Sequence, residues 1–115
     1  MNKEETLRQK KVGAQIQKDM SEILMGPAAH LTRGKVVSVT KVRMSPDLTM
    51  AKIYVSVFPF AASDETVAGL KKATTTLRHE LGQRVRHQLR LVPEINFYVD
   101  DSIEYAEKID KLIAL

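Results

Sequence analysis

Cysteine and tryptophan are absent from the 115-residue chain, and aromatic residues make up only 5% of it. Without cysteine there is no disulfide, no thiolate metal ligand and no cysteine nucleophile. So few aromatic rings argue against the base-stacking platform with which RRM-type proteins bind single-stranded RNA. No apolar run approaches the roughly 18 to 20 residues that a membrane span requires. We therefore expect one soluble, cytoplasmic globular domain over residues 1–115, with no membrane partner.

Groups that could converge for catalysis or metal binding are also scarce. Among the three histidines, His79 and His87 would be about two helical turns apart, roughly 12 Å, too far to share a metal ion. Asp100 and Asp101 suit the end of a strand and the cap of a helix better than acid–base work. There is no glycine-rich phosphate loop and no serine elbow. We expect no enzyme activity, no metal, no cofactor and no small-molecule substrate.

Positive charge is unevenly distributed along the chain. The net charge is +4, but the last sixteen residues hold five acidic and two basic side chains, so the first 99 residues carry +7. A basic body suits a polyanionic partner, because lysine and arginine gain binding energy by releasing counterions from phosphates. The alternative is a modestly basic domain whose charges serve only solubility.

The first part of the chain reads as an amphipathic helix. Apolar residues recur every three or four positions from Glu4 to Met25, and Gly26-Pro27 then ends the pattern. The opposite face is cationic and is either a binding stripe or simply solvated. Its basic residues are Arg8, Lys10, Lys11 and Lys18.

Two strands and a turn follow. The segment Lys35–Met44 is rich in β-branched residues, and Met50–Phe58 alternates apolar and polar positions, with Pro59 ending it. Ser45-Pro46-Asp47 supplies turn chemistry, so we expect an antiparallel pair. The alternation changes phase between Val39 and Val42, which indicates a bulge.

A threonine triplet interrupts the next helical region. Ser63 is expected to cap a short helix, and a second apolar stripe continues to Arg90. Between them Thr74, Thr75 and Thr76 weaken helix propensity and offer hydroxyls that compete for backbone groups. The sequence permits either a kink near residues 73–76 or one continuous helix. A kink would expose backbone N–H groups to phosphate, with Lys71, Lys72 and Arg78 beside them.

The remaining segments predict a third strand and a final helix. Ile95, Phe97 and Val99 alternate with polar residues, which is typical of a strand with one buried face. Asp101 and Glu104 then form a capping-box pattern, followed by a helical apolar stripe over residues 103–113.

This order of elements, α-β-β-α-(kink)-α-β-α, resembles a type II KH-like α+β domain with a three-stranded sheet packed against helices. Three stretches are similar to ribosome-binding factor A, a family of bacterial assembly factors. They are the helix opening RQKKV…IxxxMSxIL from Arg8 to Leu24, VTKVRMSPDLTMAKIYVSV from Val39 to Val57, and LRHELG from Leu77 leading through LRLVPEINFYVDDSIE to Glu104. Together they cover nearly the whole chain.

The resemblance implies a function and a site. It implies binding to the immature small (30S) ribosomal subunit, late maturation of 16S rRNA, a common link to cold adaptation, and a monomer off the ribosome. In KH domains a GXXG loop clamps the nucleic-acid backbone, and in this family a shorter Ala-x-Gly kink is similar to it. The matching residues here are Ala73-Thr74-Thr75, with threonine where the family has glycine, so close clamping by Thr75 is disfavoured.

The expected RNA-binding set therefore combines the kink with two basic stripes and reads mainly charge and shape. It comprises Arg8, Lys10, Lys11, Lys18, Lys71, Lys72, Ala73, Thr74, Thr75, Arg78, Arg84, Arg86 and Arg90. The alternative is a protein–protein interaction module with a KH-like fold and no direct RNA role, which would use the sheet edge or the acidic last helix.

Overall fold

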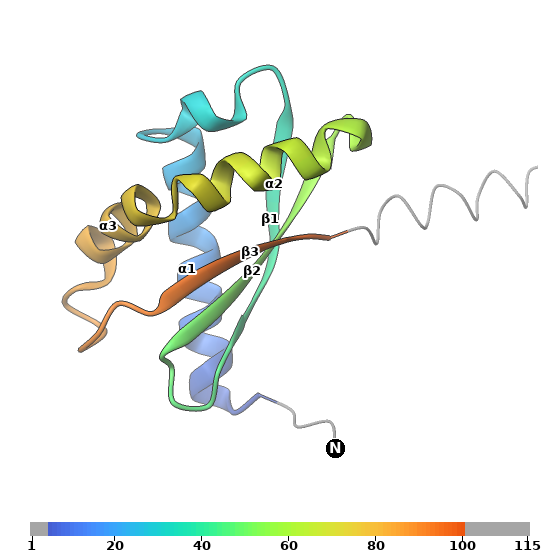
Figure 1. The fold of residues 1–115 in the computed structure, drawn as a ribbon. Helices are drawn as coiled ribbons and strands as arrows, with labels where there is room; N and C mark the ends of the chain where they lie inside the picture. The colour runs from blue at the N-terminus through green and yellow to red at the C-terminus, as the bar shows by residue number, and fades with distance from the viewer. Residues whose placement is uncertain (1–4, 101–115) are drawn as a thin grey trace, which may run out of the picture.

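The computed structural model describes residues 5–100, so the final helix expected over residues 103–113 lies outside the described residues. The order of helices and strands is the KH-like order expected from the sequence (Figure 1). The elements are α1 (Leu7–Met25), the 3₁₀ turn η1 (Ala29–Thr32), β1 (Val36–Met44), β2 (Met50–Phe58), the 3₁₀ turn η2 (Phe60–Ala62), α2 (Ser63–Lys72), α3 (Thr74–Val85) and β3 (Glu94–Val99). Within residues 5–100 no helix is both long enough and apolar enough to cross a membrane.

The three strands form one sheet in the order β1-β2-β3. As expected, β1 and β2 pair antiparallel, whereas β3 runs parallel to β2. The alternating side chains Ala51, Ile53, Val55 and Val57 of β2 are at most 2% exposed, while the intervening positions face outward. The predicted bulge is confirmed, because the pairing register shifts between Val39 and Lys41. The sheet thus has one buried face and one open face.

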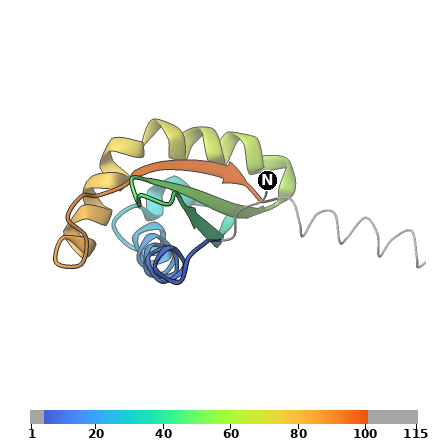
Figure 2. The same ribbon diagram turned by 90° about the horizontal axis from the view of Figure 1, so that it is seen from below.

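The helices cover the buried face of the sheet. Helix α1 packs mainly against β1, and α2 packs against β3 and β2, so each helix covers its own half of that face (Figures 1 and 2). Helix α3 contacts α1 and closes the core between them. The largest fully buried side chains are Phe97, Ile16, Met20, Ile23, Ile53, Leu70, Leu77 and Leu81.

Two glutamines of α1 satisfy the main chain of the edge strand β1. Gln9 donates from Nε2 to the carbonyl oxygen of Met44 at 2.8 Å. Gln17 donates to the carbonyl oxygens of Val39 at 3.1 Å and Thr40 at 3.3 Å, where the bulge leaves backbone groups outside the regular ladder. An edge strand otherwise presents unpaired carbonyls, so these bonds fix the position of α1 along β1.

The closeness of α1 to β1 depends on Gly13. A Cβ atom built at this glycine would lie 2.9 Å from the carbonyl oxygen of Val42. No real side chain tolerates that distance from a backbone atom, so the glycine allows the helix to rest directly on the strand.

The turn between β1 and β2 is organised by one carboxylate. Oδ1 of Asp47 accepts hydrogen bonds from Oγ1 of Thr49 at 2.7 Å, Oγ of Ser45 at 2.8 Å and the backbone N–H of Thr49 at 3.1 Å. These hydrogen bonds hold the pKa of Asp47 below its ordinary value. The hydroxyl of Thr49 contributes most, followed by the hydroxyl of Ser45. Leu48 adopts a left-handed φ of 62° within this turn.

The helix starts expected from the sequence were wrong in two places. Helix α1 begins at Leu7 rather than Glu4, because Thr6 is the N-cap and forms a reciprocal capping box with Gln9. Leu7 itself is 69% exposed and does not belong to the core face. Ser63 is the first residue of α2 rather than its cap, and the N-cap Ala62 makes no side-chain bond.

The apolar stripe expected to remain helical up to Arg90 ends earlier, with α3 stopping at Val85. The backbone N–H groups of Gln88 and Leu89 both bond to the carbonyl oxygen of Val85, at 2.8 and 2.9 Å, which closes the helix with a tight turn. The chain must reverse direction after Val85, because β3, the next strand, packs alongside α3. Leu89 keeps its place against the core although it is no longer helical.

Candidate nucleic-acid interface

The threonine triplet marks a break between two helices. Helix α2 ends at Lys72 and α3 begins at Thr74, with Ala73 between them at φ −93° and ψ 11°. The kink is confirmed, and the continuous helix is excluded. The hydroxyl of Thr74 donates to the carbonyl oxygen of Lys71 at 2.7 Å, in place of a regular ladder bond.

The break creates a new helix start. The first helical bond of α3 runs from the N–H of Leu77 to the carbonyl oxygen of Ala73 at 2.9 Å. The N–H groups of Thr74, Thr75 and Thr76 therefore have no partner within α3, as in any first helical turn. Such a turn attracts anions through its unpaired donors and its dipole.

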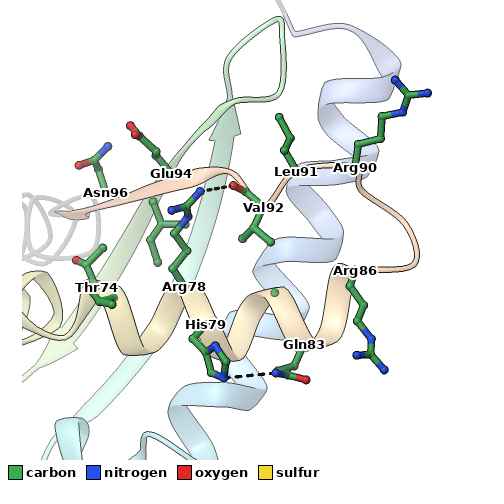
Figure 3. A pocket seen from close by; sticks show the side chains of 13 residues that line it. Thr74, Arg78, His79, Gln83, Arg86, Arg90, Leu91, Val92, Glu94 and Asn96 are labelled. Atoms are coloured by element: carbon green, nitrogen blue, oxygen red, sulfur yellow. Dashed lines mark hydrogen bonds between the residues drawn. The ribbon is translucent and has the colours of Figure 1, made fainter.

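Beside this helix start lies a groove of about 830 Å³, which we call the α3–β3 groove (Figure 3). One wall is α3, and the other is formed by the segment before β3 and by the outer edge of β3. Its lining residues are Thr74, Thr75, Arg78, His79, Gly82, Gln83, Arg86, Arg90, Leu91, Val92, Glu94, Ile95 and Asn96. Gly82 leaves room for Val92, since a Cβ atom there would lie 3.1 Å from a Val92 methyl group.

Arg78 joins the two walls of the α3–β3 groove. Its Nε donates to the carbonyl oxygen of Pro93 at 3.1 Å. Its Nη2 donates to the carbonyl oxygen of Val92 at 2.7 Å (Figure 3). The guanidinium thus holds the chain that leads into β3, while its charge remains at the groove. Arg78 is a positioning residue as much as a free cation.

Four other cations of the predicted set precede or follow α3, and two of them, Arg86 and Arg90, line the groove. Lys71 and Lys72 are exposed at the end of α2, about one helical turn before Thr75. Arg86 and Arg90 follow α3, and Figure 3 shows their side chains pointing outward from that end of the groove. Glu94 is the acidic side chain among the lining residues.

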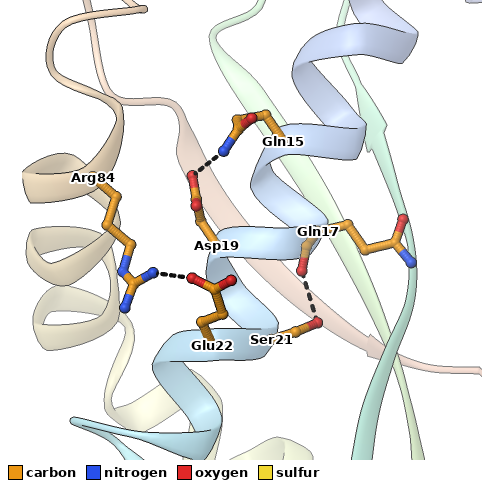
Figure 4. A network of polar contacts seen from close by, with 6 residues as sticks. All are labelled: Gln15, Gln17, Asp19, Ser21, Glu22 and Arg84. Carbon is orange, nitrogen blue, oxygen red and sulfur yellow. Dashed lines mark hydrogen bonds and ion pairs between the residues drawn. The ribbon is translucent and has the colours of Figure 1, made fainter.

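Arg84 belongs to a different surface. Its guanidinium forms an ion pair with the carboxylate of Glu22 on α1 (Figure 4). On the same helix, Gln15 donates to Asp19 at 3.0 Å. Arg84 therefore ties α3 to α1, whereas Arg86 and Arg90 line the groove.

The cations of α1 form a separate group. Arg8, Lys11 and Lys18 recur at helical spacing on the outer face of α1, whereas Lys10 is turned from Lys11 by about 100°. All four are exposed. The predicted constellation is thus divided between the α3–β3 groove and α1.

Several groove residues were not predicted from the sequence. His79 and Gln83 lie one turn apart on α3, 3.4 Å between their ring nitrogen and amide nitrogen, and Asn96 lies on β3. The helical spacing of the first two was readable, but their place beside β3 required the fold. No cluster of three or more histidine or acidic side chains within residues 5–100 could hold a metal ion.

Comparison with known proteins gives consistent similarities. The family model described as Ribosome-binding factor A matches residues 8–113. Ribosome-binding factor A of Flavobacterium johnsoniae is 48% identical over 111 residues, covering 96% of this chain and 85% of the relative. The protein of the same name from Streptococcus sanguinis is 39% identical over 110 residues, covering 92% and 90%.

Solved structures share the fold. The crystal structure of ribosome-binding factor A from Thermus thermophilus matches with a TM-score of 0.68 at 22% identity, covering 79% of this chain and 94% of that one. The solution NMR structure of a Thermotoga maritima protein matches at 0.55 and 30% identity, covering 81% and 91%. A Thermus thermophilus homology model fitted into the cryo-EM map of a 30S–RbfA complex matches at 0.63 and 24%, covering 77% and 91%.

Proposed function

Since this chain belongs to the ribosome-binding factor A family, we propose that it binds the immature small ribosomal subunit and assists late maturation of its 16S rRNA. The observation that carries the proposal is the α3–β3 groove, in which a helix start opened by a break lies beside arginines and a strand edge. In this proposal the protein acts in the bacterial cytoplasm as a monomer off the ribosome. It uses no cofactor and catalyses no reaction, and its loss slows growth in the cold.

The groove offers RNA two kinds of contact. The first turn of α3 presents backbone donors and the positive end of its dipole to a phosphate. Lys71 and Lys72 add positive charge before this turn, and Arg86 and Arg90 add it at the other end of the groove. None of the four forms an ion pair within residues 5–100. Such contacts position an RNA backbone and read its shape more than its sequence.

Thr75 modifies this contact relative to the family glycine. Its side chain is exposed at the start of α3, where a glycine would let a phosphate approach the backbone more closely. Affinity in this chain therefore depends more on the surrounding cations than on backbone clamping.

The test is co-sedimentation of the purified protein with small subunits, mature ribosomes and isolated 16S rRNA at two salt concentrations. The variant Lys71→Glu/Lys72→Glu should lose roughly tenfold or more in retention on small subunits and show a flatter salt dependence. The matched variant Lys11→Glu/Lys18→Glu makes the same charge change on α1 and should lose less.

Two results would contradict the proposal. Equal retention of the groove variant, Lys71→Glu/Lys72→Glu, and of the wild type would remove the helix start of α3 with its two preceding lysines as the binding surface. Retention that is indifferent to both variants, to salt and to nuclease treatment would fit the protein–protein interaction module instead.

A further inference from the structure

The open face of the sheet carries an aromatic and cationic row that crosses all three strands. Lys41, Tyr54 and Tyr98 are neighbours in the strand pairing. Nζ of Lys41 lies 4.7 Å from the centre of the Tyr54 ring, and the Tyr54 and Tyr98 rings stack with centres 5.4 Å apart and planes inclined by 29°. Composition alone gives no sign of this row, because it is the strand pairing that brings together two tyrosines far apart in the sequence.

Tyr98 is the accessible end of this row. Because β2 is the central strand, Lys41 and Tyr98 flank Tyr54 from opposite sides. β3 is an edge strand, so no further strand of residues 5–100 covers the outer side of Tyr98, whose side chain is 39% exposed. Among residues 5–100, Tyr98 is thus the ring of the row that is open enough to offer a planar partner a stacking contact.

The neighbouring row is cationic. Arg43 and Lys52 are direct cross-strand partners, and neither forms an ion pair with any side chain of residues 5–100. Like charges placed directly opposite each other destabilise a sheet. An anionic partner lying across the pair would remove that repulsion.

The rest of the face distinguishes RNA from a protein partner. Its exposed apolar side chains lie apart, with Val36 and Phe58 paired at one end and Met50 at the other. A protein interface would instead bury a continuous apolar centre. Among residues 5–100, the acidic side chains on this face are Glu94, beside Met50, and Asp100, which accepts a hydrogen bond from Thr40. The centre therefore combines cations with rings.

We propose that the open sheet face is a second RNA-binding surface, which takes a single-stranded segment with its phosphates over Arg43 and Lys52 and one base stacked on Tyr98. Asn96 connects the two surfaces, since it lines the α3–β3 groove and pairs with Lys52 across the sheet. A strand leaving the groove can cross β3 at this residue. The inference extends the proposed function but does not require the ribosomal subunit.

The test measures binding of a fluorescein-labelled ten-nucleotide oligouridine by anisotropy. Tyr98→Ala should weaken binding roughly tenfold, because loss of a stacked base has an effect of that order. Tyr98→Phe keeps the ring and should bind like the wild type. Arg43→Gln/Lys52→Gln should weaken binding and flatten its salt dependence. A blunt RNA duplex should bind more weakly than the oligouridine, since its bases are already stacked.

Thermal unfolding of each variant shows whether it is folded, and NMR amide shifts of the wild type locate the bound oligouridine. Unchanged affinity of folded Tyr98→Ala, or equal binding of the duplex, would overturn the inference.

The groove variant Lys71→Glu/Lys72→Glu separates the two proposals. If it alone abolishes oligouridine binding, the second surface is wrong while the groove stands. If the open-face variants weaken oligouridine binding while the groove variant is retained on small subunits as well as the wild type, the groove proposal is wrong and the proposal of a second surface stands.

Discussion

At the scale of single residues, the arginines of α3 and its C-terminal end differ in whether their charge is already engaged by other groups of the protein. Arg78 donates to two backbone carbonyls, and Arg84 is paired with Glu22. Among the described residues, the Arg86 side chain hydrogen-bonds to His87 and forms no ion pair. The sequence shows three arginines within nine residues but not which of them is free. The contacts formed in the fold decide which of these charges is available to a partner.

Replacing Arg78 should affect stability as well as binding. Arg78→Ala removes two hydrogen bonds from a charged donor to the chain before β3, so we expect the free energy of unfolding to fall by about 1 to 2 kcal/mol. Urea unfolding followed by circular dichroism measures this. The control is Gln83→Ala on the same helix, expected within about 0.5 kcal/mol of the wild type. An Arg78→Ala protein as stable as this control would show that the two bonds do not hold the segment.

Asp47 should make the stability of the β1–β2 turn depend on acid pH. Its pKa is depressed in the folded protein by the hydroxyls of Thr49 and Ser45. A depressed carboxyl pKa stabilises the fold above the unfolded pKa, and this contribution is lost as pH falls through the folded value. The melting temperatures of the wild type and Asp47→Asn should therefore converge on acidification below the ordinary range of an aspartate. A gap that stays constant with pH would contradict this assignment.

At the scale of elements, alternation and helical spacing predicted most of the fold. The second strand and the bulge were predicted, because each depends on local residue preferences. The same preferences left the region of residues 73–76 open between a kink and a continuous helix, and the structure shows the kink. The end of α3 was not predicted, since Leu89 continues the apolar spacing while the chain already turns. The hydrogen bonds of Gln9 and Gln17 to β1 were not predicted either, because the sequence position of a glutamine on a helix does not indicate which strand that helix packs against.

The contact between α1 and β1 gives a prediction with a matched control. Gly13→Ala places a methyl group against the Val42 carbonyl and should lower the free energy of unfolding by about 1 to 3 kcal/mol, despite the better helix propensity of alanine. Gly69→Ala lies in α2 with nothing within 4 Å of the added atom and should raise stability by roughly 0.5 to 1 kcal/mol. Denaturant unfolding of both variants tests the pair, and two shifts of the same sign would contradict it.

At the scale of the whole molecule, folding divides a basic surface into parts. The excess of positive charge ahead of the last sixteen residues was readable from composition alone. The sequence did not predict that the α3–β3 groove and the outer face of α1 would be separate surfaces, because the cations of both lie on helices and helical spacing does not place two helices relative to each other. The low aromatic content also gave no sign of a stacked pair of rings on the sheet, because Tyr54 and Tyr98 become neighbours only through the pairing of β2 with β3.

This division predicts different effects for two nearby arginines. Arg84→Ala should cost less than about 1 kcal/mol of stability, as for an exposed ion pair, and should leave retention on small subunits unchanged. Arg86→Ala should leave stability unchanged and weaken retention several-fold, with a smaller salt slope. Co-sedimentation and urea unfolding of the two proteins check both halves. Weaker retention of Arg84→Ala would mean that the ion pair opens on the subunit.

The parallel pairing of β3 with β2 has a consequence for synthesis of the protein. The β1–β2 hairpin joins neighbours in the chain, but β3 reaches β2 only across residues 59–93, and closing so long a loop is slow compared with forming a hairpin. β3 is also one wall of the groove and the edge that carries Tyr98. A nascent chain that has not yet been translated to residue 99 therefore lacks both proposed surfaces, so under the two proposals neither surface can bind RNA before the sheet is complete.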